Sequence, residues 1–255
     1  MTNTSTNLPP KLAIGAFRFL WREFSTFLHC ALIPIFVALL WHLASLFLPL
    51  NFSMLIAIKY TVMYFFMGYF GVRWLTYVME KNRSILPLAP VKFTKKEAQY
   101  AVILFFLTLI IFATNLLLGK ILFSVIAPLI GTLFMLVFAV FVQVFITAFF
   151  AARFKFLLVD VSLGRPLNAP MVWRKTRAIW PRLMGSLILV WFFAILIFAP
   201  LILIVLLFSD VASTVPSAEF YFHVLTRYAW IQDILQYFIA ALELYVIAHY
   251  YKAVS

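Results

Sequence analysis

Long runs of apolar residues alternate with short polar segments along the whole chain. A helix needs about 20 consecutive apolar residues to cross the hydrocarbon core of a bilayer. Runs of this length predict six membrane-spanning helices, at residues 24–48, 52–79, 98–118, 131–159, 183–208 and 229–251. Membrane-spanning β-strands are excluded, because the runs are too long and lack an alternation of period two. The pattern therefore predicts an all-α fold, a polytopic helical bundle within a membrane.

The segment 11–23, before the first run, has an amphipathic helical pattern. Its basic residues Lys11, Arg18 and Arg22 share one stripe of the helix, and apolar side chains lie on the opposite side. We expect this helix to lie on the membrane surface, with its basic stripe on anionic head groups. Residues 1–10 are expected to form a flexible tail, and residues 11–255 a single membrane domain.

A second amphipathic segment, 168–182, precedes the fifth run. Asn168 is suited to cap a helix here, and Pro170 is tolerated in its first turn. Tryptophan and aliphatic side chains share one half of this helix. The basic residues of the other half are Arg174, Lys175, Arg177 and Arg182. We expect a second interfacial helix, whose basic half contacts anionic lipid or a membrane-protein partner.

Two local signals concern the ends of the third and fourth spans. The sequence from Thr94 to Glu97 fits a capping box, which predicts a helix start near residue 95. The apolar stretch from Ile121 to Ala152 is too long for one upright helix. We therefore expect residues 119–130 to form a short outer segment that leads into the fourth span, with a single long tilted helix as the alternative.

Composition and charge support a membrane protein and indicate its orientation. Apolar residues make up 66% of the chain and charged residues only 11%, far from the balance of a water-soluble domain. Of the 20 Lys and Arg residues, 17 fall at the ends of the chain or in and around every second loop, two fall in the other loops, and Lys59 lies inside a span, far from the basic loops. This bias predicts cytoplasmic N and C termini in a bacterial inner membrane. The formal net charge of +12 does not indicate nucleic-acid binding, because no soluble basic module is present.

Sequence motifs of enzymes and metal sites are absent. The chain lacks the nucleophile, phosphate-binding and zinc-binding motifs, and Cys30 is its only cysteine. The four histidines are never spaced by three or four residues along the chain. We therefore expect no catalytic residues, no metal and no cofactor.

Four of the charged residues within the predicted spans are candidates for a role inside the membrane. An ionisable group at the bilayer centre costs about 2.5–3.5 kcal/mol on insertion scales, so each one is a candidate functional residue. The depths of Lys59 and Asp233 from the outer side are similar, and Arg73 is the inner-half cation nearest in depth to Glu243. We predict two ion pairs between the second and sixth spans, Lys59–Asp233 and Arg73–Glu243. These pairs either fix helix register or line a polar path.

The segment between the fourth and fifth spans carries a resemblance to a family. The run Ala152–Asp160, then Gly164-Arg165-Pro166, then Trp173–Leu183 resembles the signature loop of the YciC-like bacterial inner-membrane proteins. That family is related to the membrane domain attached to some glycerophosphodiester phosphodiesterases. The resemblance implies six helices. The matching positions are Arg153, Asp160, Trp173, Thr176 and Leu183.

The chain also departs from the family pattern. The family's Pro-Gly opening of span four is spread here from Pro128 to Gly131, and Arg177 replaces a small residue. No phosphodiesterase domain is present, and the resemblance implies no catalytic residue.

Three functions follow as hypotheses. The first is a non-enzymatic scaffold, assembly or envelope-homeostasis factor, based on the absent motifs and the two basic helices. The alternative is a transporter or permease subunit for a lipid or small solute, based on the intramembrane charges and on helix breaks expected at Pro34, Pro128 and Pro200. The third is an intramembrane enzyme, for which only Glu243, Asp233 and distant histidines are available.

Overall fold

The computed structural model describes residues 9–45, 52–80, 93–121, 124, 132–208 and 229–254, and all regular structure within these ranges is helical. The helices are α1 (Pro9–Arg22), α2 (Phe24–Ser45), α3 (Phe52–Glu80), α4 (Lys95–Ile121), α6 (Thr132–Phe154), α7 (Phe156–Ser162), α8 (Ala169–Thr176), α9 (Trp180–Phe208) and α11 (Ala229–Val254). The all-α prediction is therefore confirmed. The expected tail, apart from Pro9 and Pro10, and most of the outer segment 119–130 lie outside the described residues.

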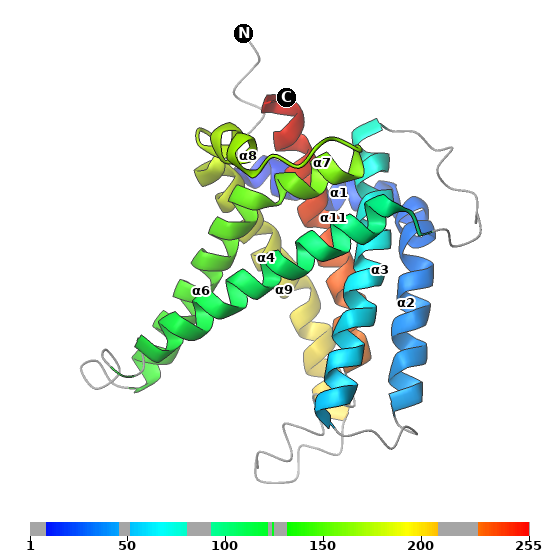
Figure 1. Ribbon diagram of the computed structural model, residues 1–255. Coiled ribbons are helices and arrows are strands. Elements are labelled where there is room, and N and C mark those ends of the chain that lie inside the picture. The colour runs from blue at the N-terminus through cyan, green and yellow to red at the C-terminus, as the bar shows by residue number, and fades with distance from the viewer. Residues whose placement is uncertain are drawn as a thin grey trace.

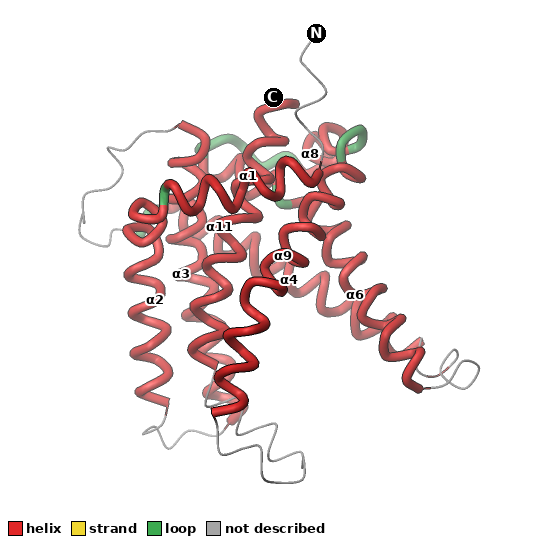
Figure 2. Tube along the Cα trace, turned by 180° about the vertical axis from the view of Figure 1, so that it is seen from behind, coloured by secondary structure: helices red, strands yellow, loops and turns green. Residues whose placement is uncertain are grey.

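Four long helices form the body of the molecule. Helices α2, α3, α9 and α11 stand side by side, and α11 packs against the other three (Figure 1). Helices α1, α7 and α8 lie with the C-terminal turn of α11 at one end, which we call the capped end (Figure 2). Helix α4 begins near the capped end, and helix α6 ends near it. Both helices lean away from the body, so their other ends lie to one side of it.

Within the described ranges, five segments are long and apolar enough to cross a membrane. They are Phe24–Ala44, Lys95–Ile121, Phe138–Ser162, Trp180–Pro200 and Trp230–Val254. The chain is thus a multi-pass membrane protein. Helix α3 is also long, with 29 residues, and carries Lys59 and Arg73 among its apolar side chains.

The boundaries differ from prediction at the two junctions around α7. The span expected at 131–159 corresponds to the apolar segment Phe138–Ser162, but its helix is interrupted at Lys155, and α7 continues across the capped end. This bend buries Phe156, Leu158 and Val159 against the body. The expected continuous helix 168–182 is wrong, because α8 ends at Thr176 and three turn residues precede α9.

Helix α1 is placed differently from the surface helix that its pattern predicts. Its apolar stripe of Leu12, Ala13, Ala16 and Leu20 is buried, and α1 packs on α9 and α11. The amphipathic pattern therefore marks a protein interface, and only the opposite stripe faces outward. The helix also begins at Pro9 and not at residue 11, since prolines are tolerated in a first turn.

The other local predictions have mixed outcomes. Asn168 caps α8 by accepting a hydrogen bond from the Met171 amide at 2.9 Å, as predicted. Helix α4 begins at Lys95, and the Thr94 amide donates to Glu97 at 2.8 Å. The breaks expected at Pro34 and Pro200 are wrong, because α2 and α9 continue through them.

Candidate functional site: an intramembrane cavity and its polar end

A cavity of about 280 Å³ lies where α4 and α6 lean away from the body. Helices α3, α4, α6, α7, α9 and α11 all contribute to its wall, so it forms only when the whole fold is assembled. Most of the lining is apolar and includes Met63, Met67, Leu104 and Leu107. These walls suit a hydrocarbon chain or another apolar body.

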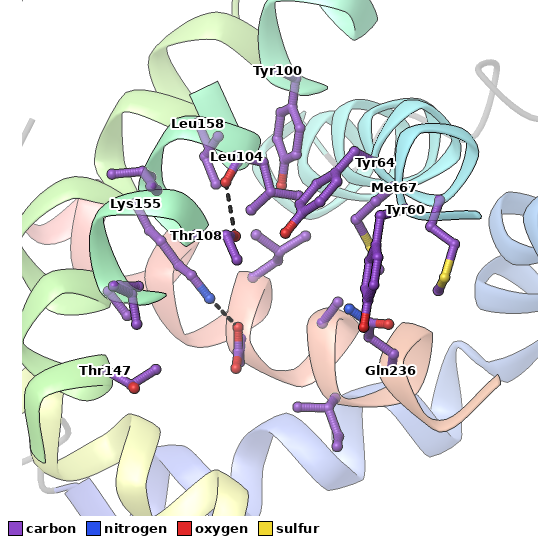
Figure 3. A pocket seen from close by; sticks show the side chains of 18 of the residues that line it. Tyr60, Tyr64, Met67, Tyr100, Leu104, Thr108, Thr147, Lys155, Leu158 and Gln236 are labelled. Carbon is purple, nitrogen blue, oxygen red and sulfur yellow. Dashed lines mark hydrogen bonds and ion pairs between the residues drawn. The ribbon is translucent and has the colours of Figure 1, made fainter. Parts of the chain in front are cut away.

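One ion pair marks the polar end of the cavity. The Lys155 ammonium donates a hydrogen bond to one oxygen of Glu243, and Figure 3 shows this contact beside the cavity. The indole N–H of Trp191 donates to the other oxygen of the same carboxylate. The carboxylate is therefore held by two donors from two other parts of the chain. The Lys155 and Glu243 side chains are only 17% and 11% exposed.

The break between α6 and α7 explains how a lysine reaches this depth. Lys155 is the residue between the two helices, and its amide still bonds to the Ala151 carbonyl at 3.1 Å. One turn earlier on α6, Ala151 also lines the cavity. Since residues four apart share a helix face, Lys155 is directed to the same side.

Hydroxyl and amide groups are also present along the wall. Tyr60, Tyr64, Thr108 and Gln236 line the cavity, and Figure 3 shows Tyr60 of α3 beside Gln236 of α11. Thr108 bonds to its own helix at the Leu104 carbonyl, at 2.9 Å. The wall is therefore mainly apolar, with a charged pair at one end and neutral polar groups elsewhere.

The four intramembrane charges have two outcomes. The predicted Lys59–Asp233 pair is confirmed, with a nitrogen–oxygen distance of 3.1 Å between α3 and α11. The predicted Arg73–Glu243 pair is wrong. Glu243 bonds to Lys155 and Trp191, while the Arg73 guanidinium lies 4.0 Å from the centre of the Tyr69 ring.

Three of the five motif positions, Arg153, Trp173 and Thr176, meet at the junction of α6 and α8. The Arg153 guanidinium stacks 3.6 Å from the centre of the Trp173 ring and donates to the Thr176 hydroxyl at 3.2 Å. Asp160 lies elsewhere and accepts a hydrogen bond from the Tyr251 hydroxyl. The Arg165 guanidinium donates to the same hydroxyl at 2.7 Å. Both clusters tie the segment around α7 and α8 to the membrane helices.

The predicted basic surfaces are largely on the outside of the capped end. Lys11, Arg18 and Arg22 are exposed on α1, as are Arg174, Arg177 and Arg182 around α8. Lys175 is half-buried, and its ammonium lies 5.6 Å from the centre of the Tyr251 ring. These placements leave most of the basic groups free to meet a lipid surface.

Sequence reasoning missed Lys155, Trp191 and Tyr251. Lys155 is one of the basic residues around the loop between the fourth and fifth spans. Its place in a long apolar stretch was the signal that it could lie among the membrane helices. Within the described ranges, no three His, Cys, Asp or Glu side chains are grouped to hold a metal ion.

Comparison of the chain with protein-family models, curated proteins and solved structures finds no match. The resemblance to the YciC-like proteins therefore stays an expectation based on the residues of one loop.

Proposed function

We propose that this protein binds an amphiphilic molecule, a lipid or a lipid-like solute, in the cavity between α3, α4, α6 and α11. In this proposal it serves, without catalytic chemistry of its own, as a transporter or permease subunit for that molecule. The observation that carries the proposal is the pairing of apolar walls with the Lys155–Glu243–Trp191 cluster at one end of a cavity within the membrane segments.

The chemistry of this cavity supports an amphiphile over a simple ion or an apolar compound. Ligand sites are mostly apolar, with a few placed polar groups that fix orientation. Ionisable residues are costly in a bilayer, and they commonly mark the pathways of substrates and ions. A ligand with one polar end would place that end at Lys155 and Glu243 and its apolar part along α3 and α4.

We further propose that the chain crosses a bacterial inner membrane six times, with α3 as the sixth span and both termini in the cytoplasm. The capped end, with its exposed basic residues on α1 and α8, would then face the cytoplasm. The positive-inside rule supports this orientation.

Binding of a fluorescent phosphatidylcholine, which has no net charge, to the detergent-purified full chain tests the proposed site. Ala240 lines the cavity, and Ala240→Phe should fill part of it and weaken binding at least about tenfold, the equivalent of about 1.4 kcal/mol. Ala44→Phe is the matched control, since Ala44 is exposed on α2 and does not line the cavity. Equal affinities for the two variants would contradict the proposal.

Flux across proteoliposomes then separates transport from binding alone. The same phospholipid should cross with the unchanged protein and stop crossing with Ala240→Phe. Binding without any flux would leave a lipid-binding membrane protein and reject the transport role.

The scaffold or assembly role is the second candidate function. The exposed basic groups at α8, Arg174, Arg177 and Arg182, favour it because they are available to an acidic partner. Replacing all three by Gln should remove a co-purifying membrane protein if this role is correct, without changing phospholipid binding in the cavity.

A further inference from the structure

Arg153 is a buried cation without a counter-charge. The residue is 4% exposed, and its Nε atom is buried without a hydrogen-bond partner. Among the described residues no acidic side chain forms an ion pair with it, and its polar contact is the neutral hydroxyl of Thr176. Buried charges in proteins are normally paired, because removing a charge from water is costly.

The surroundings of Arg153 add positive charge. Arg177 directly follows Thr176, the residue whose hydroxyl Arg153 contacts, so a second guanidinium group stands at the same junction and repels the first. The face of the Trp173 ring and the carbonyl end of α6 offset part of this repulsion, since both are regions of negative potential. Neither supplies a full negative charge, so the pair of guanidinium groups is suited to an anion.

An apolar ridge on α6 leads to this pair. Phe141, Phe145, Phe149 and Arg153 follow one another at intervals of four residues and lie along one side of the helix. Phe141 and Phe145 are well exposed, and Phe149 packs edge-on against Trp173 and Trp180. Tryptophan is enriched at the level of lipid head groups, which is where this pair would place the end of the ridge.

We propose that the α6–α8 junction is a binding site for an anionic phospholipid, with its phosphate at Arg153 and Arg177 and an acyl chain along the phenylalanine ridge. The ridge from Phe141 to Arg153 is about 18 Å long at 1.5 Å per residue, close to the half-thickness of a bilayer core, about 15 Å. Trp173, which is 40% exposed, is the group that moves to admit a phosphate oxygen to the Arg153 Nε.

This site is separate from the cavity. Thr147 and Ala151 of α6 line the cavity, whereas Phe149 and Arg153 are each two residues further along, on the opposite side of the helix. The lipid at the junction is therefore a bound component of the protein and not the molecule held in the cavity.

Thermal unfolding of the delipidated full chain in a neutral detergent tests the proposal. Phosphatidylglycerol should raise Tm by about 5–10 °C at a concentration a hundredfold above its Kd. Phosphatidylcholine, which has the same acyl chains without net charge, should have little effect. Inorganic phosphate distinguishes the two sources of the anion, and a full increase with phosphate alone would overturn the assignment to a lipid.

The variant Arg153→Gln should lose the increase that phosphatidylglycerol causes. Its Tm in phosphatidylcholine should not fall, because the variant removes an unpaired buried charge. Arg182→Gln removes the same charge from an exposed position and should keep the full increase. A purely structural role for Arg153 would instead lower Tm in both lipids and preserve the difference between them, which would overturn the proposal.

A second variant keeps the test decisive if Arg153→Gln does not fold. Arg153→Lys retains the charge but loses the planar fork of donors that suits a phosphate. Its affinity for phosphatidylglycerol should fall at least about threefold, and native mass spectrometry should show less of this lipid retained. Unchanged affinity and retention would overturn the role of Arg153.

Discussion

Glu243 connects three helices through its single carboxylate. It lies on α11, and its two oxygens accept hydrogen bonds from Lys155, at the start of α7, and Trp191, on α9. In a region of low dielectric such a group is favourable only while its partners are in place. The removal of one partner should therefore be more damaging than the replacement of the whole pair.

Lys155→Met should reduce the free energy of unfolding by about 3 kcal/mol, because it leaves a buried carboxylate without its counter-charge. The double variant Lys155→Met with Glu243→Gln should recover at least half of this loss, since glutamine still offers an oxygen to Trp191. Denaturant unfolding in detergent measures both changes. Arg22→Ala is the control, because Arg22 is 71% exposed in its pair with Glu23 and should cost at most about 1 kcal/mol. Additive effects of the two single changes at Lys155 and Glu243 would contradict the coupling.

The two intramembrane pairs differ in how well the sequence predicts them. Lys59 and Asp233 lie on helices that run straight through the body, so an estimate of depth along each helix was enough to pair them. The partner of Glu243 depends on a bend between α6 and α7. Depth along a straight helix cannot reveal that bend. The sequence therefore predicted Arg73 as the partner of Glu243, whereas the structure pairs Glu243 with Lys155.

At the scale of helices, two glycines on α3 allow α4 to approach closely. A Cβ atom added at Gly68 would lie 2.6 Å from the Glu97 carbonyl oxygen, and at Gly71 it would overlap the Tyr100 ring. The absence of side chains at these positions lets the backbones meet where α4 begins. This contact determines how far α4 can lean and thus supports one wall of the cavity.

Gly68→Ala should destabilise the protein by about 1–3 kcal/mol, because the atom in its way is part of a helix backbone and cannot rotate aside. The matched control is Gly15→Ala on α1, where an added Cβ meets nothing within 4 Å. That variant should be neutral or stabilise by up to about 1 kcal/mol, as alanine favours a helix. Thermal unfolding compares the two, and equal Tm values would argue against the close approach.

Helix α1 illustrates what an amphipathic pattern leaves undecided. The sequence predicted its length and its two faces correctly, but a buried apolar stripe looks the same whether lipid or protein covers it. In the structure the cover is α9 and α11, and Ala13 and Ala16 have no exposed surface. The small side chains at these positions were the signal for close helix packing.

Ala16→Leu should therefore destabilise the protein by about 1–3 kcal/mol, because the added atoms have no space at this interface. The triple replacement of Lys11, Arg18 and Arg22 by Gln should change stability by at most about 0.5 kcal/mol per site, since these side chains are exposed. Unfolding in a neutral detergent measures both effects without anionic lipid. The reverse order of the two effects would favour a helix held only by the membrane surface.

For the whole molecule, the location of charge provides the strongest link between sequence and structure. The apolar runs predicted the long helices, and alternate loops with many Lys and Arg residues predicted that these loops share one side. The structure brings α1, α7, α8 and the end of α11 to one end, although they are far apart in the sequence. The lean of α4 and α6, and with it the cavity, depends on packing between distant residues, and no local pattern indicates it.

This arrangement leads to a prediction about orientation. Helix α4 ends at Ile121, on the side of the molecule away from the capped end, whereas α11 ends at Val254 within it. A reporter that is active only in the cytoplasm should therefore work when fused after Ser255 and fail when fused after Lys120. Alkaline phosphatase, which needs the periplasm, should show the opposite pattern.

The two fusion sites control for each other, because expression affects both reporters alike. Phosphatase activity at Ser255 would contradict the proposed cytoplasmic C terminus, and equal activity at both sites would reject an odd number of spans between Lys120 and Ser255. Because the three spans α6, α9 and α11 lie between these two positions, the two fusion sites must lie on opposite sides of the membrane.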